Sequence, residues 1–233
     1  MNFNVNHKVG FLATAAGLAL IALTATVHQK FTEIKARNLD VVTVFQGLQN
    51  HQTADMMHDA LRSDVLSAMD AVRRGDTAGH AEVVTETAEH IGVFRQSQAD
   101  NAALPLPPAV LAALTETRPQ VESYLKAAER LVALAATDPA ATTAALPDFR
   151  KTFGDLETAL GNISDIFKTE AARINTSAAD AVTRFQRTLL GSALASLLAL
   201  AIIAVLVARN IPRPFAAIIG SLGNVSEANA TSA

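Results

Sequence analysis

Two long apolar runs lie near the ends of the chain, and a more polar stretch separates them. Residues 9–27 and residues 188–208 contain no charged side chain. At 1.5 Å per helical residue, each run is long enough to cross a hydrocarbon core of about 30 Å. The pattern therefore predicts transmembrane helices at 9–27 and 188–208, with a separate domain of 28–187 between them.

Proline and glycine divide the intervening domain into four stretches without breaks. Gly75 and Asp76 end the first stretch, three prolines at 105, 107 and 108 follow the second, and Asp138-Pro139 follows the third. Pro119 predicts a kink inside the third stretch. The predicted helices are 28–73, 76–103, 109–136 and a fourth that begins at 144–147 and continues into the second apolar run.

Apolar side chains recur along these stretches at alternating spacings of three and four. The fourth stretch has Phe149, Phe153, Leu156, Leu160, Ile163, Phe167 and Ile174; the first has Phe31, Ile34, Val41, Phe45, Leu48, Leu66 and Met69; the third has Leu111, Leu114, Val121, Leu125 and Val132. Such spacing is typical of helices that pack in a left-handed bundle. We expect an all-α fold, an antiparallel four-helix bundle of long helices running up-down-up-down, continuous with two transmembrane helices.

The apolar repeat of the first stretch is interrupted by polar residues, and two interpretations are open. Either the interruption forms a pocket for a small polar ligand, or this side faces solvent while Met57, Leu61, Val65 and Val72 face inward. A turn near Gly75 places residues of the first two stretches whose numbers sum to roughly 150 at one height, so we expect Asp55 to face Arg95, and Arg62 to face Glu86, Glu89 and His90. Counting back along the third stretch from its distal end places Arg118 near Asp55, which gathers opposite charges from three helices. The ligand-binding residues predicted on this basis are Asp55, His58, Asp59, Arg62, Glu86, His90, Arg95 and Arg118.

The remaining chemistry excludes several classes of protein. The chain has no cysteine, a net charge of −3 and 5% aromatic residues, so thiolate sites and nucleic-acid binding are not expected. His51, His58 and His90 do not follow a recognised metal-ligand spacing. Phosphate-binding loops and nucleophile motifs are absent from the sequence. We therefore expect a protein that is not an enzyme and has neither metal nor cofactor.

The charges beside the apolar runs predict the orientation in the membrane. Lys8 precedes the first run, and Arg209 and Arg213 follow the second. By the positive-inside rule, the tails 1–8 and 209–233 are expected in the cytoplasm and residues 28–187 on the opposite side. The first run is longer than the apolar part of a typical secretory signal, so we interpret it as an uncleaved anchor.

The segment after the second apolar run, ARNIPRPFAAIIGSLGNVSEAN, resembles the opening of a HAMP linker. The resemblance rests on Arg209, Pro214 and a heptad of Ile211, Phe215, Ile218, Leu222 and Val225. The complete arrangement is similar to the sensory half of a bacterial methyl-accepting chemotaxis protein. This resemblance implies a two-pass protein of the bacterial inner membrane, a periplasmic sensor domain, signalling by helix displacement, and a relay role for Pro214. It also implies that a downstream signalling domain or chain supplies the output.

Alternatives to a chemoreceptor share the same architecture. The sensor module could belong to a histidine kinase or cyclase receptor, or the chain could be a membrane-anchored spacer without a ligand. In each case the first and fourth predicted helices are expected to extend beyond the four-helix region, which leaves Phe31, Ile34, Val41 and Ile174 outside it. Their apolar faces then need a partner, and a second copy of the chain would supply it, which predicts a homodimer.

Overall fold

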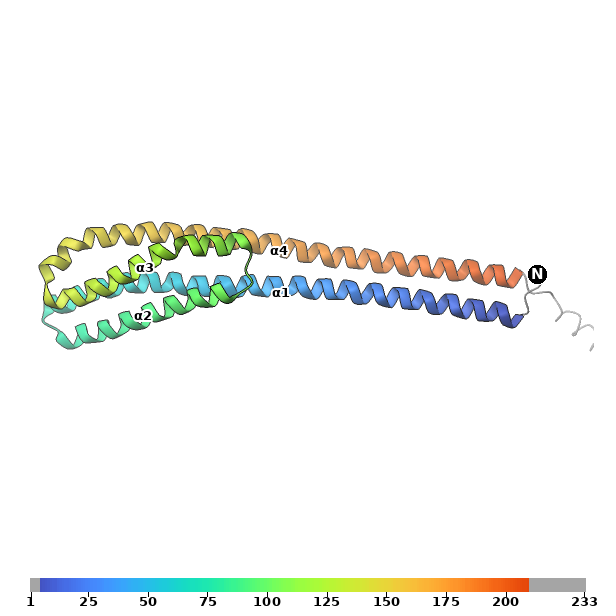
Figure 1. Ribbon diagram of the computed structural model, residues 1–233, viewed down its shortest axis with the longest axis horizontal. Helices are drawn as coiled ribbons and strands as arrows, with labels where there is room; N and C mark the ends of the chain where they lie inside the picture. Colours follow the sequence, from blue (N-terminus) through green and yellow to red (C-terminus); the bar gives the residue numbers. More distant parts are fainter. Residues whose placement is uncertain (1–4, 210–233) are drawn as a thin grey trace, which may run out of the picture. The chain divides into compact units, whose positions relative to one another are not determined.

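The computed structural model describes residues 5–209, which form four long helices joined by short connections (Figure 1). The helices are α1 (Val5–Arg74), α2 (Thr77–Ala103), α3 (Pro108–Thr137) and α4 (Pro139–Arg209). No strand occurs within residues 5–209, so the predicted all-α class is confirmed. The HAMP-like segment and Pro214, predicted as a signal relay, lie outside the described residues.

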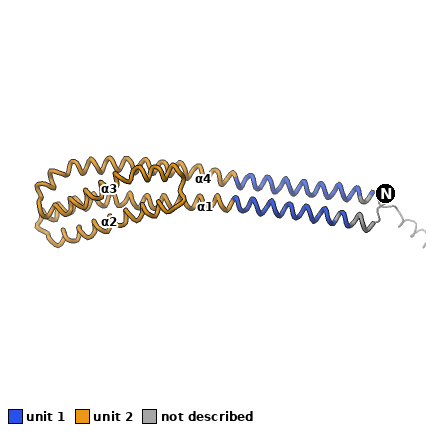
Figure 2. The backbone as a smooth tube through the Cα atoms, in the orientation of Figure 1, with its two compact units in different colours: residues 1–33, 181–233 blue, residues 34–180 orange. Residues whose placement is uncertain are grey.

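The chain divides into two compact units (Figure 2). Unit 2 comprises residues 34–180, and unit 1 comprises residues 1–33 together with 181–233. Helices α1 and α4 each contribute residues to both units, whereas α2 and α3 belong to unit 2 alone.

In unit 2, segments of all four helices lie side by side and share one hydrophobic core (Figure 2). The buried stripe of α4 consists of Phe149, Phe153, Leu156, Leu160, Ile163, Phe167 and Ile174, as its spacing predicts. Ile174 is only 8% exposed and belongs to the core, so, against expectation, it needs no second copy of the chain to cover it. On α3, the predicted Val121, Leu125 and Val132 are buried.

The buried face of α1 differs by about one position from the prediction. Phe31, Phe45 and Leu66 are 63%, 55% and 43% exposed. Asp64 and Ala71 are buried, as is the longer series Val44, Gly47, His51, Ala54, His58, Leu61, Val65 and Ala68. This series also alternates in steps of three and four. The large apolar residues suggested the wrong register because the true core positions of α1 include glycine, alanine and histidine. Val41, expected to be unpartnered, packs partly buried against the core.

Capping side chains set the beginnings of α2 and α4. The Oδ1 atom of Asp76 accepts a hydrogen bond from the Gly79 amide, and Oδ1 of Asp138 accepts one from the Ala141 amide. Pro139 occupies the first position of α4, where no amide hydrogen is needed. The helix therefore begins earlier than the predicted 144–147, and Pro147 lies inside it. Pro119 likewise lies inside α3.

The α4 part of unit 1 has the composition of a membrane span. Among the described residues, α4 contains a window of mean hydropathy 2.6, none of which is buried, so this helix is long and apolar enough to cross a membrane. Leu190, Leu194, Leu197 and Leu198 are each more than 60% exposed. Lipid would remove this apolar surface from water. The first predicted span, at 9–27, lies within α1 and stays a prediction.

Replacement by alanine should change the stability of unit 2 in opposite directions at two mid-helix glycines, Gly47 and Gly154. A Cβ atom at Gly47 would lie 2.6 Å from Leu106 Cδ2 and 3.0 Å from Phe167 Cε1, whereas one at Gly154 would meet nothing within 4 Å. Gly154→Ala should raise the unfolding free energy by up to about 1 kcal/mol through helix propensity. Overpacking should make Gly47→Ala about 1–3 kcal/mol less stable than Gly154→Ala. Denaturant unfolding, followed through the single tyrosine, measures both; equal effects would contradict the close packing at Gly47.

Candidate functional site

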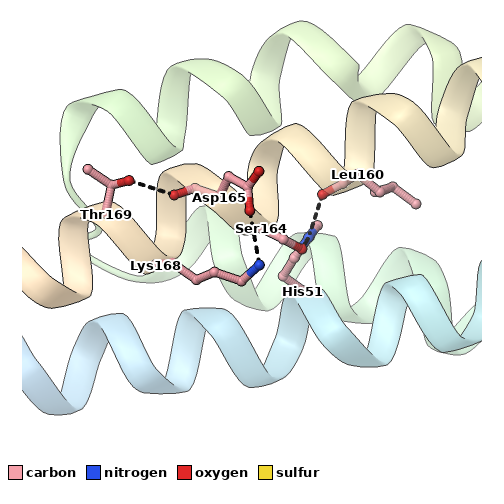
Figure 3. Close-up of polar contacts among 6 residues, drawn as sticks. All are labelled: His51, Leu160, Ser164, Asp165, Lys168 and Thr169. Carbon is pink, nitrogen blue, oxygen red and sulfur yellow. Dashed lines mark hydrogen bonds and ion pairs between the residues drawn. The ribbon is translucent and has the colours of Figure 1, made fainter.

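Two buried histidines of α1 make polar contacts with the backbone of α4. His51 is 2% exposed, and its Nε2 atom lies 3.1 Å from the Leu160 carbonyl oxygen and 2.9 Å from Ser164 Oγ. Figure 3 shows the imidazole reaching from α1 to these two groups, beside an Asp165–Lys168 pair that stays on α4. The His51 ring also stacks on Phe167, with ring centres 5.6 Å apart. His51 therefore links α1 to α4 through polar and aromatic contacts together.

His58 repeats this arrangement seven residues further along α1. It is 1% exposed, its Nε2 atom lies 3.2 Å from the Phe153 carbonyl oxygen, and its ring stacks on the Phe153 ring at 4.1 Å. The Tyr124 hydroxyl of α3 donates to the His58 carbonyl oxygen at 2.7 Å. Burial raises the pKa of Tyr124, so this hydroxyl stays protonated and remains a donor. Three helices thus meet at His58.

The two acceptors on α4, Phe153 and Leu160, are also seven residues apart. This matched spacing means that a single register of α1 against α4 satisfies both contacts. A slide of one residue would move both Nε2 atoms by about 1.5 Å along the helix axis, which would lengthen and misalign both contacts together. The histidine pair therefore defines the axial position of α4 relative to α1 within unit 2.

Both imidazoles are buried as neutral groups with the proton on Nε2. A carbonyl oxygen only accepts hydrogen bonds, so Nε2 must be the donor in each contact. Burial lowers the pKa of His51 and of His58 from the ordinary value of 6.5, although the hydrogen bonds to the Leu160 and Phe153 carbonyls and nearby carboxylates partly oppose the shift. Protonation would place a cation in the core of unit 2, which is unfavourable without a buried partner.

The predicted site residues of α1 are divided between the core and the surface. His58 is buried, whereas Asp55, Asp59 and Arg62 are exposed. Nη2 of Arg62 lies 3.9 Å from Asp59 Oδ1, and its guanidinium carbon lies 4.4 Å from the centre of the Phe153 ring. It was expected to face Glu86 and His90 of α2; it covers an aromatic ring of α4 instead, because this face of α1 looks toward α4. The exposed carboxylates agree with the alternative of a solvated face.

The predicted residues of α2 and α3 have separate surroundings. Nδ1 of His90 lies 2.7 Å from the buried Asp64 carboxylate of α1, and Arg95 forms a bidentate pair with Glu122 of α3 instead of meeting Asp55. Hydrogen bonding to Arg95 lowers the pKa of Glu122. Glu86 is exposed on α2. Arg118 lines a shallow hollow of about 120 Å³ with α2, away from α1.

The predicted height relation between α1 and α2 nevertheless holds at two contacts. Asp64 meets His90, and Asn50 donates to Asn101 Oδ1 at 3.0 Å. The charge pattern does not reveal which polar residues occupy the core. The predicted site lacks the buried His51, Asp64 and Tyr124 and the half-buried Ser164, although the seven-residue spacing of His51 and His58 is visible in the sequence. Among the described residues, no group of three or more histidine or carboxylate side chains could hold a metal ion.

A cavity of about 500 Å³ lies in unit 2 near the ends of α1 and α3 and the beginning of α4. Its lining consists of Leu66, Met69, Asp70, Val72, Arg73, Ala135, Pro139, Thr142 and Thr143. This volume is within the usual range for small-molecule sites, roughly 300–1,000 Å³. None of the eight predicted ligand-binding residues lines it.

The chain matches no protein-family model, no curated protein and no solved structure.

Acid should weaken the packing of unit 2 through the two histidines. Since their folded-state pKa values lie below 6.5, the unfolded chain binds more protons once the pH falls below about 6.5. Stability should therefore be complete above 6.5 and decline as the pH falls toward the folded-state values, by up to about 1.4 kcal/mol per pH unit for each histidine.

Denaturant unfolding of the whole chain between pH 7 and pH 5, followed through Tyr124, measures this slope. The double variant His51→Leu, His58→Leu should have a flatter dependence over the same interval, whatever its stability at pH 7. A slope equal to that of the parent would show that these two groups do not control the acid response.

Proposed function

We propose that this chain is the transmembrane sensor module of a chemoreceptor. In this proposal the domain of 28–187 is an antiparallel four-helix bundle in the periplasm, it binds a small molecule, and it signals by displacing α4 along α1. Residues 9–27 and 188–208 anchor it in the bacterial inner membrane, and both tails are cytoplasmic. The protein acts without catalysing a reaction.

Several features support the antiparallel bundle. Two contacts show that α1 and α2 run in opposite directions: Asn50 meets Asn101, and Asp64, further along α1, meets His90, which comes earlier in α2. The same relation holds between α1 and α4 through His51 with Leu160 and His58 with Phe153. The α4 helix continues through its apolar window to Arg209, which fits direct continuity with a membrane span.

The observation that carries the proposal is the pair of buried histidine contacts between α1 and α4. These two helices contain the apolar runs, and they are also the helices whose relative position the histidines define. Each contact is already 3.1–3.2 Å long, so a small axial displacement of α4 would weaken both together. In this proposal a signal moves α4 out of the single register that the two histidines favour.

The output is expected beyond α4. In the proposed receptor, the HAMP-like segment with Pro214 receives the displacement and passes it to a signalling domain or chain. The small polar ligand predicted at Asp55, His58, Asp59, Arg62, Glu86, His90, Arg95 and Arg118 stays a prediction, and it would meet members of that set on separate faces, since Arg95 pairs with Glu122 and Arg118 lines a hollow with α2.

A homodimer would place two such modules side by side. On α1 of unit 2, Leu39, Val42 and Phe45 are 58%, 61% and 55% exposed, which leaves an apolar face without a partner in one chain. A parallel second copy would cover this face. Cross-linking in membranes between single cysteines at position 42 or 45 of two chains would support the dimer; failure at every position from 39 to 45 would argue for a monomer.

Signalling can be tested by joining the whole chain, after Ala233, to the cytoplasmic half of a chemoreceptor that controls a kinase. Membrane-impermeant small molecules added outside should change kinase activity, because the sensor domain lies outside and the C-terminal tail inside. His51→Leu, His58→Leu should lower the response at least several-fold by releasing α4 from α1.

His80→Leu is the matched control for this experiment. His80 is also a histidine bonded to a helix carbonyl, at 2.9 Å, but it joins α2 to Val132 of α3. Its loss should leave most of the response intact. Equal responses of the double variant and the parent would contradict coupling through α1 and α4. If the inserted parent responds to none of the compounds tested, the receptor proposal is wrong.

A further inference from the structure

The cavity near the beginning of α4 has polar groups that are already hydrogen-bonded within the protein. Thr142 Oγ1 donates to the Asp138 carbonyl and Thr143 Oγ1 to the Pro139 carbonyl, each at 2.9 Å. The Asp70 carboxylate accepts from Arg73 and also lies 3.1 Å from Nε of Arg74. The charged and hydroxyl groups of the lining therefore have partners without any ligand.

The rest of the lining is apolar and comes from three helices. Leu66, Met69 and Val72 belong to α1, Ala135 to α3, and Pro139 begins α4. A charged ligand entering here would gain no unpaired counter-charge, because Asp70 and Arg73 are already paired with each other. An apolar body would instead gain from leaving water, and a single ligand hydroxyl could donate to Oγ1 of the exposed Thr143, which keeps acceptor capacity.

We propose that this cavity binds a small neutral molecule with an apolar body and one hydroxyl group. The occupant would contact both α1 and α4, which gives the sensor module a ligand at a place separate from the predicted polar level. This inference rests on the proposed function only in treating the occupant as a signal; binding itself is a property of the cavity.

Three compounds of nearly equal shape test the chemical class. Isothermal titration of the whole chain in lipid nanodiscs, with empty nanodiscs as the blank, should show 2-phenylethanol binding at least tenfold more tightly than phenylacetate or 2-phenylethylamine. If either charged compound binds as tightly as 2-phenylethanol, the proposed class is wrong.

A pair of surface variants tests the location. Leu66→Glu places a carboxylate in the lining at a position that is 43% exposed, so the fold should tolerate it. It should weaken 2-phenylethanol binding at least tenfold. Val84→Glu, at a position of α2 with the same 43% exposure, should leave the affinity within about twofold.

The remaining outcomes separate this inference from the proposed function. If Leu66→Glu binds as tightly as Val84→Glu, the site is elsewhere. If 2-phenylethanol does not bind and Leu66→Glu dissociates a dimer, the cavity is a contact between copies and the inference fails. Binding with the expected pattern, together with no kinase response in the receptor fusion, would support the site and contradict the sensor function.

Discussion

Two imidazole hydrogen bonds to the backbone of α4 define the register on which the four-helix region depends. Apolar burial is non-directional, so it defines the register less sharply than a hydrogen bond does. A buried donor that loses its acceptor costs roughly 1–3 kcal/mol. His51 and His58 would lose theirs together, since the donors on α1 and the acceptors on α4 have the same seven-residue spacing.

Aromatic packing makes these contacts sensitive to their surroundings. Phe153 supplies the carbonyl acceptor for His58, stacks on its ring, and lies under the Arg62 guanidinium. Tyr124 closes the same region from α3 through its bond to the His58 carbonyl. Protonation, a shift of α4 or loss of one ring would therefore alter several contacts at once. This dense coupling is the basis on which we propose a sensor that works by displacement of α4.

The sequence could predict those parts of the fold that large apolar residues or strong breaking residues specify. The stripe of α4 was recognisable because phenylalanine, leucine and isoleucine occupy its buried positions, and Gly75 and Pro105 marked real helix ends. The register of α1 could not be found in this way. Its core positions include Gly47, Ala54 and two histidines, whereas the larger Phe31 and Phe45 are exposed.

The candidate site was harder to predict for the same reason. In a hydrophobicity pattern, histidine counts as a polar residue and so interrupts the apolar repeat. His51 and His58 can be buried because carbonyl oxygens of α4 accept their hydrogen bonds, which the sequence does not show. Charge patterns predicted groups at similar heights but not which helix face each would occupy, so Arg62 lies over Phe153 and Arg95 pairs with Glu122. The cavity near Pro139 had no signal in the sequence, because it depends on where α4 begins.

Nitrogen-15 NMR of the six histidines in the whole chain tests the central interaction directly. His51 and His58, assigned through single His→Leu variants, should show neutral rings protonated at Nε2, with a scalar coupling across the hydrogen bond to carbonyl carbons of α4. Both rings should titrate with a pKa below the ordinary value of 6.5. Rings that titrate near the ordinary value of 6.5, or that are protonated at Nδ1, would contradict the proposal that these contacts hold α1 and α4 in register.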